Sequence, residues 1–467
     1  MSTLSRRVVL AAGLAGTSTV LGAGQVHAAA PGTDCRDREP DPDAPVSFTG
    51  WHTAGQWRQG TARGVVAAPG SHGDGHGHGH GPGRGHGHRA RAGIVIGHPI
   101  DTVEYTDPHT GETREWEIAT WTSPLTELSF GASELIASWN ADTPSGSWLQ
   151  IEMQGRYDDG TETPWYVMGR WAAGEDDITR TSVDGQGDDR SSIYTDTFSI
   201  DDPDTDRLAA YRLRLTLHRT PGTDITPTVW RVGAMSSHIP DRFEVPASTP
   251  GEAAGIELDV PRYSQSIHSG QYPEFGGGGE AWCSPTSSEM IIESFGRAPS
   301  EEDMSWVDPT YSDPQVCHAA RRCFDKQYDG CGNWPFNAAY AATFPDMDAI
   351  ITRLNSLDDV EKLVAAGFPV ITSQSFLESE LDGAGYGTDG HLMTVIGFTA
   401  DGDVIANDPA SPSNEAVRHV YRRRQFENIW LRTKRYNSSG NIAGGSGGVV
   451  YLYKTTDQSW PELPNVE

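Results

Sequence analysis

The chain has 467 residues, which is enough for two or three domains with separate hydrophobic cores. Its 64 Asp and Glu residues outnumber its 35 Lys and Arg residues, so the formal net charge is −29. This balance argues against nucleic acid and anionic membranes as partners, because binding to phosphate needs clustered Lys and Arg side chains.

Residues 1–30 have the pattern of an export signal. Arg6 and Arg7 stand directly before an uncharged run, rich in Ala, Gly and Leu, that extends to Gly24. Val26 and Ala28 then fit the small-residue positions of a signal-peptidase site. The paired arginines resemble a twin-arginine signal, with an ordinary secretory signal or an uncleaved anchor as alternatives. No later segment approaches the roughly 20 apolar residues of a membrane span, so we expect a soluble, exported protein.

Residues 31–92 are predicted to be a flexible, disordered linker. They are rich in Gly, Pro, Asp and His, and an alternating Gly-His tract between His72 and His88 carries six imidazoles. Glycine at that density cannot bury enough surface to fold alone. The imidazoles can give incidental affinity for zinc, nickel or copper, but the tract implies no ordered ligand geometry. We therefore expect no catalytic metal and no cofactor.

Residues 93–240 are predicted to form an all-β sandwich domain. Short runs with strand-like alternation recur between turn signals such as Asp159-Gly160 and Pro221-Gly222, and no helical pattern interrupts them. This series is typical of an antiparallel jelly roll, and it resembles the galactose-binding-like modules attached to secreted enzymes. The predicted strands are Gly93–Ile96, Trp116–Trp121, Glu134–Asn140, Trp148–Tyr157, Trp165–Trp171, Ile193–Ile200, Ala209–Leu217 and Val229–Ser236.

Aromatic residues in this domain have two interpretations. Alternating tryptophans in strands mostly fill the core of a sandwich, and we favour this interpretation. The alternative is an exposed platform for a sugar or a cell-wall ligand, so carbohydrate remains a second candidate partner. The residues concerned are Trp139, Trp148, Trp165, Tyr166 and Trp171.

Residues 241–255 are predicted to be a linker, and residues 256–467 to form a domain of mixed α and β structure. Helices come first and an antiparallel set of strands follows, which is an α+β layout. The predicted helices begin at Cys283, at a capping box in Ser300–Asp303, and over Pro314–Lys326, Leu357–Ala366 and Phe426–Leu431. The predicted strands are Pro369–Ser375, His391–Phe398, Asp403–Asn407 and Gly448–Tyr453.

Cys283 is the candidate nucleophile. A run of four glycines leads to Trp282 and Cys283, and the helical pattern that follows has Pro285 in its first turn and Gly296 at its end. A thiol at a helix N-terminus is favoured as thiolate by the unpaired amides and the helix dipole. In a secreted chain, however, a cysteine is more often a disulfide partner.

Three further residues complete a candidate site. His391 follows a glycine-rich loop and opens an apolar strand, and Asp408 ends the next strand. Neighbouring antiparallel strands can bring the two side chains together, so the carboxylate can orient an imidazole that acts as general base. Gln265 carries an amide that can stabilise an oxyanion together with the Cys283 backbone N–H.

The other cysteines bear on the redox state of the chain. Five cysteines leave an odd one in an oxidising compartment, which is consistent with a free thiol. Three of them cluster in sequence, so we expect a local disulfide among Cys317, Cys323 and Cys331, with undetermined connectivity. Cys35 is either free or paired with the third.

These residues resemble a known family. The segments that carry the resemblance are Val260–Gln265, Trp282–Ser287, Gly390–Gly397 and Asn407–Pro409. They are similar to the papain-clan cysteine peptidases of family thirty-nine, typified by the bacteriocin-processing, double-glycine leader peptidases, and most like the secreted stand-alone branch. The resemblance covers roughly residues 256–455 and implies a papain-like fold. It implies Cys283 as nucleophile, His391 as general base and acid, Asp408 as orienting carboxylate and Gln265 in the oxyanion hole.

Two departures from the family limit how far its residue roles can be assigned to this chain. Cys283 is followed by Ser-Pro where the family often has Gly-Pro, and an insertion at Ser266–Gly279 separates Gln265 from Cys283. Within the domain, Trp282, Trp334 and Gly390 are candidates for the wall of the substrate cleft. The alternative for the two tryptophans is that they pack against the helix.

Three functions follow from this sequence. The first is a secreted cysteine peptidase acting on peptides through an acyl-enzyme. The second keeps the fold but acts on cell-wall peptides as an amidase or transpeptidase-like acyl transferase. The third is a binding protein with a degenerate papain-like domain. The intact set of four residues favours the first.

Overall fold

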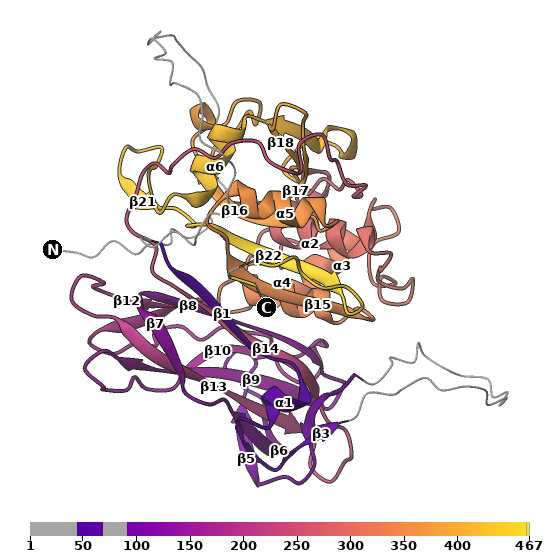
Figure 1. Cartoon of the computed structure of the whole chain (residues 1–467). Helices are drawn as coiled ribbons and strands as arrows, with labels where there is room; N and C mark the ends of the chain where they lie inside the picture. Colours follow the sequence, from indigo (N-terminus) through magenta and orange to yellow (C-terminus); the bar gives the residue numbers. More distant parts are fainter. Residues whose placement is uncertain (1–43, 69–90, 464, 467) are drawn as a thin grey trace.

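The computed structural model describes residues 44–68, 91–463 and 465–466, which form two domains packed against each other (Figure 1). The predicted export signal and the Gly-His tract lie outside these residues. No helix in the described ranges has both the length and the apolar composition that crossing a bilayer requires.

The N-terminal domain is built from two antiparallel sheets of seven strands each. The first sheet has the order β11-β12-β8-β14-β4-β3, with β1 also paired to β14. Its strands are β1 (Val46–Trp51), β3 (Val65–Ala68), β4 (Gly93–Ile96), β8 (Glu134–Asp142), β11 (Ser191–Tyr194), β12 (Thr197–Ile200) and β14 (Thr228–Ser237).

The second sheet has the order β10-β9-β13-β6-β2, with β5 paired to β6 and β7 paired to β13. Its strands are β2 (Thr61–Arg63), β5 (Asp101–Thr106), β6 (Thr113–Thr122), β7 (Thr126–Ala132), β9 (Ser147–Tyr157), β10 (Tyr166–Trp171) and β13 (Leu208–Arg219). A one-turn helix, α1 (Ala54–Trp57), precedes β2.

Aromatic side chains fill the interior of this domain, as the favoured interpretation of the sequence predicts. Trp139, Trp148 and Trp171 are at most 1% exposed, and Tyr166 is 2% exposed. Trp165 is half-buried, and the guanidinium of Arg214 lies 4.1 Å from its ring centroid. Because four of the five rings are buried, they cannot form the flat exposed platform that carbohydrate binding would need.

The linker prediction for residues 31–92 is wrong for residues 44–68. This segment supplies β1, α1, β2 and β3 to the two sheets, and Phe48, Trp51 and Trp57 are buried in the core. Their apolar pattern is short, and the glycine and histidine content of the following tract dominates the composition of the region. Burying three aromatic side chains compensates for ordering the chain, which average composition does not reveal.

The C-terminal domain is an antiparallel six-stranded sheet with helices packed on it, which confirms the α+β prediction. The sheet order is β15-β22-β16-β17-β18-β19. The strands are β15 (Met347–Arg353), β16 (Val370–Phe376), β17 (Thr388–Phe398), β18 (Val404–Asn407), β19 (Arg418–Tyr421) and β22 (Val449–Thr455), with a separate hairpin of β20 (Lys434–Tyr436) and β21 (Ile442–Gly444).

Five α-helices surround this sheet within the described residues. α2 packs against β17, α4 against β15, and α5 and α6 against β16. The helices are α2 (Cys283–Ser294), α3 (Pro314–Cys323), α4 (Trp334–Ala342), α5 (Leu357–Ala365) and α6 (Arg423–Leu431), with short 3-10 turns η1 (Ser266–His268), η2 (Gly279–Ala281), η3 (Glu378–Glu380) and η4 (Asn414–Ala416).

The helix predicted to begin at the capping box in Ser300–Asp303 is absent. The capping box at Ser300 forms, since the Asp303 N–H donates to the Ser300 hydroxyl and the Ser300 N–H donates to the Asp303 carboxylate. The residues that follow form turns rather than an α-helix. Residues 301–306 carry three acidic side chains and no apolar stripe at helical spacing, so the cap has no buried face to stabilise.

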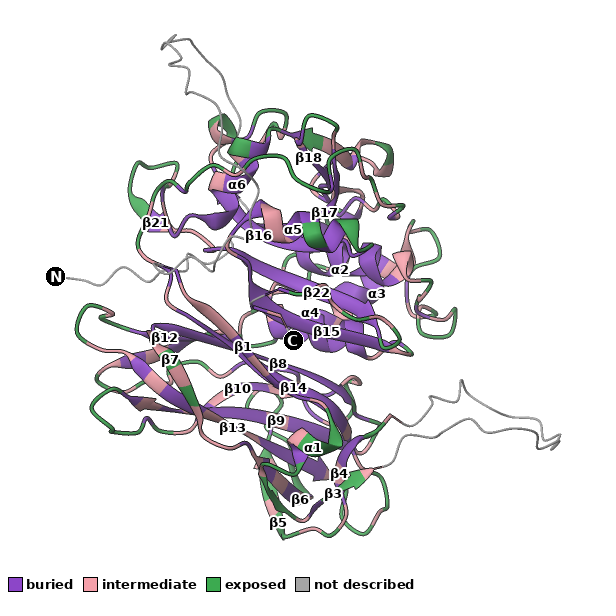
Figure 2. Ribbon diagram, in the orientation of Figure 1, coloured by how far each residue is buried: buried purple, intermediate pink, exposed green. Residues whose placement is uncertain are grey.

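The two domains share one continuous hydrophobic core, and Figure 2 shows that the strands of both domains are largely buried. At the interface, the Asn140 side-chain amide donates to the Ala349 carbonyl at 2.8 Å and accepts from the Ala349 N–H at 3.1 Å. Phe336 of α4 packs edge-on against Trp139 and Trp171. The domains therefore pack as one body.

The predicted linker, residues 241–255, contains neither a helix nor a regular strand. It nevertheless packs on the C-terminal domain, because the Gly251 and Ala253 N–H groups donate to the buried Glu361 carboxylate. Val245 and Ala253 are also buried. It is thus a connection held against the surface.

Candidate active site

The glycine run places Cys283 at the first residue of α2. Gly276, Gly277 and Gly278 have φ angles of 69°, 94° and 100°, a conformation that side-chain-bearing residues rarely adopt. Trp282 is the N-cap and provides no side-chain cap. The Cys283 side chain is therefore next to amides of the first helical turn and the positive end of the helix dipole, as the sequence predicts.

Helix α2 is fixed to the sheet by an unusually polar buried face. The Ser284 and Ser288 hydroxyls share hydrogen bonds of 2.8 Å and 3.0 Å with the hydroxyls of Tyr451 and Tyr453 on β22. The Ser287 hydroxyl donates to the Leu392 carbonyl on β17 at 3.3 Å. These contacts set the position of Cys283 relative to the strand that carries His391.

His391 and Asp408 meet across neighbouring strands. β17 carries His391, and β18 pairs with β17 in a register that sets Thr394 opposite Asn407, one residue before Asp408. The His391 Nε2 atom lies 2.9 Å from Asp408 Oδ1, and both side chains are buried. Since Asp408 holds Nε2, Nδ1 is the nitrogen left to face Cys283, which is close enough to contribute to the raised pKa of His391.

Two tyrosines that the sequence did not reveal hold Asp408 from its other side. The hydroxyls of Tyr386 and Tyr421 donate to Asp408 Oδ2 at 2.9 Å and 2.7 Å. The Ala410 N–H donates to Oδ1 at 3.0 Å. A buried carboxylate with four hydrogen-bond donors is stable as an anion and cannot rotate away from His391.

Electrostatics at this pair favour charge on both partners. Burial lowers the pKa of His391, but the Asp408 carboxylate and the Cys283 thiol outweigh it and raise the pKa to about 10. Burial raises the pKa of Asp408. The charge of His391, its hydrogen bond to Asp408 and the hydrogen bond from the Tyr421 hydroxyl outweigh burial and bring this pKa below its usual range. A protonated His391 at neutral pH adds a positive charge next to the helix N-terminus that carries Cys283.

Gln265 lies between the approach to Cys283 and the Asp408 turn. Its side-chain Nε2 donates to the Glu280 carbonyl at 2.8 Å, and its backbone N–H donates to the Pro409 carbonyl at 2.8 Å. An amide nitrogen carries two hydrogens, so one remains after the bond to Glu280. The insertion after Gln265 folds as η1 and the glycine turn, and it leaves Gln265 beside the segment that leads to Cys283.

A cavity of about 880 Å³ opens over His391. Its lining includes Trp334 and Gly390, two of the three predicted cleft residues. Trp282 is wrongly predicted: it is 0% exposed, and its indole N–H donates to the Phe275 carbonyl at 2.7 Å. It packs in a small cluster with Cys317 and Cys331, so the alternative of packing near the helix describes it better.

The predicted local disulfide is not formed. Cys283, Cys317, Cys323 and Cys331 are all free and buried, while Cys35 lies outside the described residues. Burial raises the pKa of Cys317 to about 12, and it also raises the pKa values of Cys323 and Cys331. These three thiols are therefore inert as nucleophiles near neutral pH. Among the described residues, no group of three or more His, Cys, Asp or Glu side chains is placed to hold a metal ion.

Comparisons with known proteins concern both domains. The model of the peptidase C39 N-terminal domain matches residues 74–237, and the model of the peptidase C39-like family matches residues 257–438. The resemblance to the C39 peptidases is confirmed. The C39-like match spans Gln265, Cys283, His391 and Asp408.

Solved structures give more distant matches. A crystal structure described as a C39-like peptidase from Bacillus anthracis is 17% identical, covers 43% of this chain and 97% of its own, and has a TM-score of 0.27. A structure of carbohydrate-binding modules of the β-sandwich superfamily is 11% identical, covers 43% of this chain and 58% of its own, and has a TM-score of 0.16. No curated protein matches the chain.

Proposed function

We propose that this chain is an exported cysteine peptidase that hydrolyses peptide bonds through Cys283, His391 and Asp408. The observation that carries the proposal is the 2.9 Å contact between His391 Nε2 and a fully hydrogen-bonded Asp408, beside a thiol at a helix N-terminus. The C39-like match over residues 257–438 supports the same reaction class. We also propose a papain-like fold for this domain, a jelly-roll or galactose-binding-like sandwich for the N-terminal domain, and export directed by residues 1–30.

In the proposed reaction, the Cys283 thiolate attacks the peptide carbonyl carbon. The resulting oxyanion is stabilised by the Cys283 backbone N–H and by Gln265 Nε2. His391 Nδ1 then gives its proton to the leaving amine, and the C–N bond breaks to leave an acyl-enzyme. His391 next removes a proton from water as its oxygen attacks the thioester carbon; the C–S bond then breaks, which releases the acid and restores the Cys283 thiolate and the His391 imidazolium.

Asp408 keeps the imidazole in the required state throughout. By accepting a hydrogen bond from Nε2–H, it fixes Nδ1 as the nitrogen that faces sulfur, and its charge supports the imidazolium. Burial of four of the five aromatic residues of the N-terminal domain weakens one of the two features that motivated a cell-wall enzyme, the aromatic sugar contacts, and leaves the predicted export as the other. The intact pair argues against a degenerate binding protein.

The proposal is tested with a peptide library digested in H₂¹⁸O and analysed by mass spectrometry. Wild-type protein is expected to generate new C-termini that carry ¹⁸O, because water resolves the acyl-enzyme. Cys283→Ala is expected to abolish these products while retaining the thermal transition of the wild type. Products that persist in Cys283→Ala would refute the proposal. Products joined to an amine instead of water would move the reaction to acyl transfer.

A further inference from the structure

The cavity over His391 belongs to both domains. Its lining comprises His391 and neighbouring residues of the C39-like domain on one side, and residues 184–187 and 192–197 of the N-terminal domain on the other. The second group consists of the β11–β12 hairpin and the segment that precedes it, which we call the hairpin wall (residues 184–197). A domain that forms one side of the cavity also contributes to what the cavity accepts.

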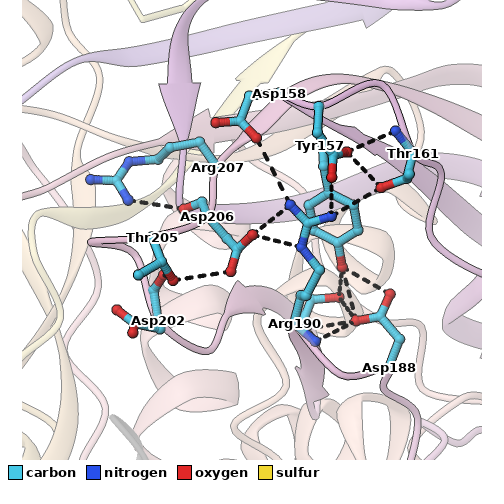
Figure 3. Close-up of polar contacts among 11 residues, drawn as sticks. Tyr157, Asp158, Thr161, Asp188, Arg190, Asp202, Thr205, Asp206 and Arg207 are labelled. Carbon is cyan, nitrogen blue, oxygen red and sulfur yellow. Dashed lines mark hydrogen bonds and ion pairs between the residues drawn. The ribbon is translucent and has the colours of Figure 1, made fainter.

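The base of the hairpin wall is fixed by a polar network (Figure 3). Asp188 accepts hydrogen bonds from the Arg190 and Ser191 N–H groups at 2.9 Å and 2.8 Å and from the Tyr157 hydroxyl at 2.8 Å. The Arg190 guanidinium lies 3.8 Å from the Tyr157 ring centroid and donates to Asp206 at 2.6 Å. This network holds the start of β11 to the body of the sandwich.

The hairpin wall is also tied to the C39-like domain on the far side of the cavity. Asp196 accepts from the Trp334 N–H at the start of α4 at 2.8 Å. Asp184 accepts from the Gln327 side-chain amide at 2.9 Å, and the Ser182 N–H donates to Asp325 at 2.9 Å. With both ends fixed, the width of the cavity is set by the fold rather than by a mobile loop.

The accessible chemistry of the cavity is aromatic and acidic. Tyr194, at the tip of the hairpin, is 37% exposed, and Asp184 is exposed. Among the described lining residues, His391 and Arg353 are the cation-forming side chains, and Arg353 is buried in an ion pair of 2.6 Å with Glu134. Asp389, also on the lining, pairs with the buried Arg435. The positive charges of Arg353 and His391 are paired with Glu134 and Asp408, so an incoming basic side chain at the hairpin wall meets an exposed ring and an exposed carboxylate.

We propose that the hairpin wall determines specificity and selects peptides that carry a lysine or arginine side chain next to the scissile bond. Tyr194 contacts the stem and the charge of that side chain, and Asp184 pairs with its cationic end. This inference rests on the proposed peptidase activity of Cys283. It assigns the N-terminal domain a direct part in substrate binding at the same site.

The test compares cleavage of matched peptides that differ only in a lysine or a norleucine next to the scissile bond. Asp184→Asn is expected to reduce the lysine preference in kcat/KM about 2- to 5-fold, while its amide oxygen can still accept from Gln327. Tyr194→Ala is expected to reduce it about 3- to 30-fold, mainly through KM. Asp204→Asn, an exposed residue of the same domain that is not part of the cavity lining, is the charge-matched control and should change nothing.

Two failures can be told apart with a second readout, alkylation of Cys283 by iodoacetamide, which needs no peptide binding. If peptides are cleaved and the lysine preference is absent in the wild type or identical in all variants, the specificity proposal is overturned while the peptidase stands. If neither cleavage nor an activated Cys283 is found, the proposed function and this inference fall together. Normal alkylation in both variants, with a lost lysine preference, supports the inference.

Discussion

Replacing Asp408 with asparagine tests the electrostatic account of the site through stability. The Tyr386 and Tyr421 hydroxyls donate to Oδ2, so the asparagine oxygen is expected to take that position and its NH₂ group to face His391. Nε2 must then accept a hydrogen bond, which places the remaining proton on Nδ1 and leaves the imidazole neutral. In wild type, the rise in the pKa of His391 from 6.5 to about 10 corresponds to a contribution of about 5 kcal/mol to the free energy of unfolding.

The sign of the pH dependence follows from this rise. Because the pKa of His391 in the folded protein lies above its unfolded value of 6.5, its stabilisation is complete below about pH 6.5 and is lost as the pH increases through about 10. Wild type should therefore exceed Asp408→Asn in thermal midpoint at pH 6.5, by on the order of 10 °C for a cooperative unit of this domain's size. The gap should narrow towards pH 10.

The assay is thermal unfolding followed by tryptophan fluorescence at pH values from 6 to 10. Asp401→Asn, an exposed residue in the turn between β17 and β18, is the control for loss of a carboxylate and should follow the wild type at every pH. A gap between Asp408→Asn and wild type that is independent of pH would refute the assigned charge states. So would a gap no larger than that of the control.

Three further predictions follow from individual contacts. Tyr421→Phe removes one donor to Asp408 and should lower kcat roughly 10-fold. It should also raise the pKa of Asp408, which would shift the acidic limb of the pH–rate profile to higher pH. An unchanged profile would show that this hydrogen bond is dispensable. Gln265→Ala should lower peptide turnover about 10²-fold without changing alkylation of Cys283, which forms no oxyanion; parallel losses in both assays would assign Gln265 a structural role instead. Burial raises the pKa of Glu289, whose carboxyl group accepts from the Tyr340 hydroxyl. Stability is therefore lost as the pH rises above about 4.5, and Glu289→Gln should raise the thermal midpoint at pH 8 but not at pH 4. An equal change at both pH values would contradict a neutral Glu289.

Local signals in the sequence were sufficient to place the candidate catalytic residues. Cys283, Pro285 and Gly296 mark a helix by rules that depend only on neighbours in the chain, and the helix forms as predicted. His391 and Asp408 end up adjacent because consecutive antiparallel strands pair, which spacing alone indicates. The aromatic core of the sandwich follows from alternation in the same way.

The parts that could not be predicted depend on how distant segments pack. Tyr386 lies in a glycine-rich loop and Tyr421 on a short strand, and neither sequence context indicates that both hydroxyls meet Asp408. Trp282, next to the candidate nucleophile, suggested a cleft wall, yet its side chain is buried. The cavity itself arises where the two domains join, through contacts such as Asp196 with Trp334, and no local pattern encodes such a junction.

The most direct test of the central claim is the pH dependence of iodoacetamide alkylation, with mass spectrometry identifying the cysteine that reacts. Cys317, Cys323 and Cys331 are buried with raised pKa values, so reaction in the neutral range should concentrate at Cys283. We expect half-maximal reactivity at Cys283 well below the free-thiol value of about 8.5, and loss of this reactivity in His391→Ala. Reaction of Cys283 only above that value, or equally in His391→Ala, would contradict an activated thiolate at this site.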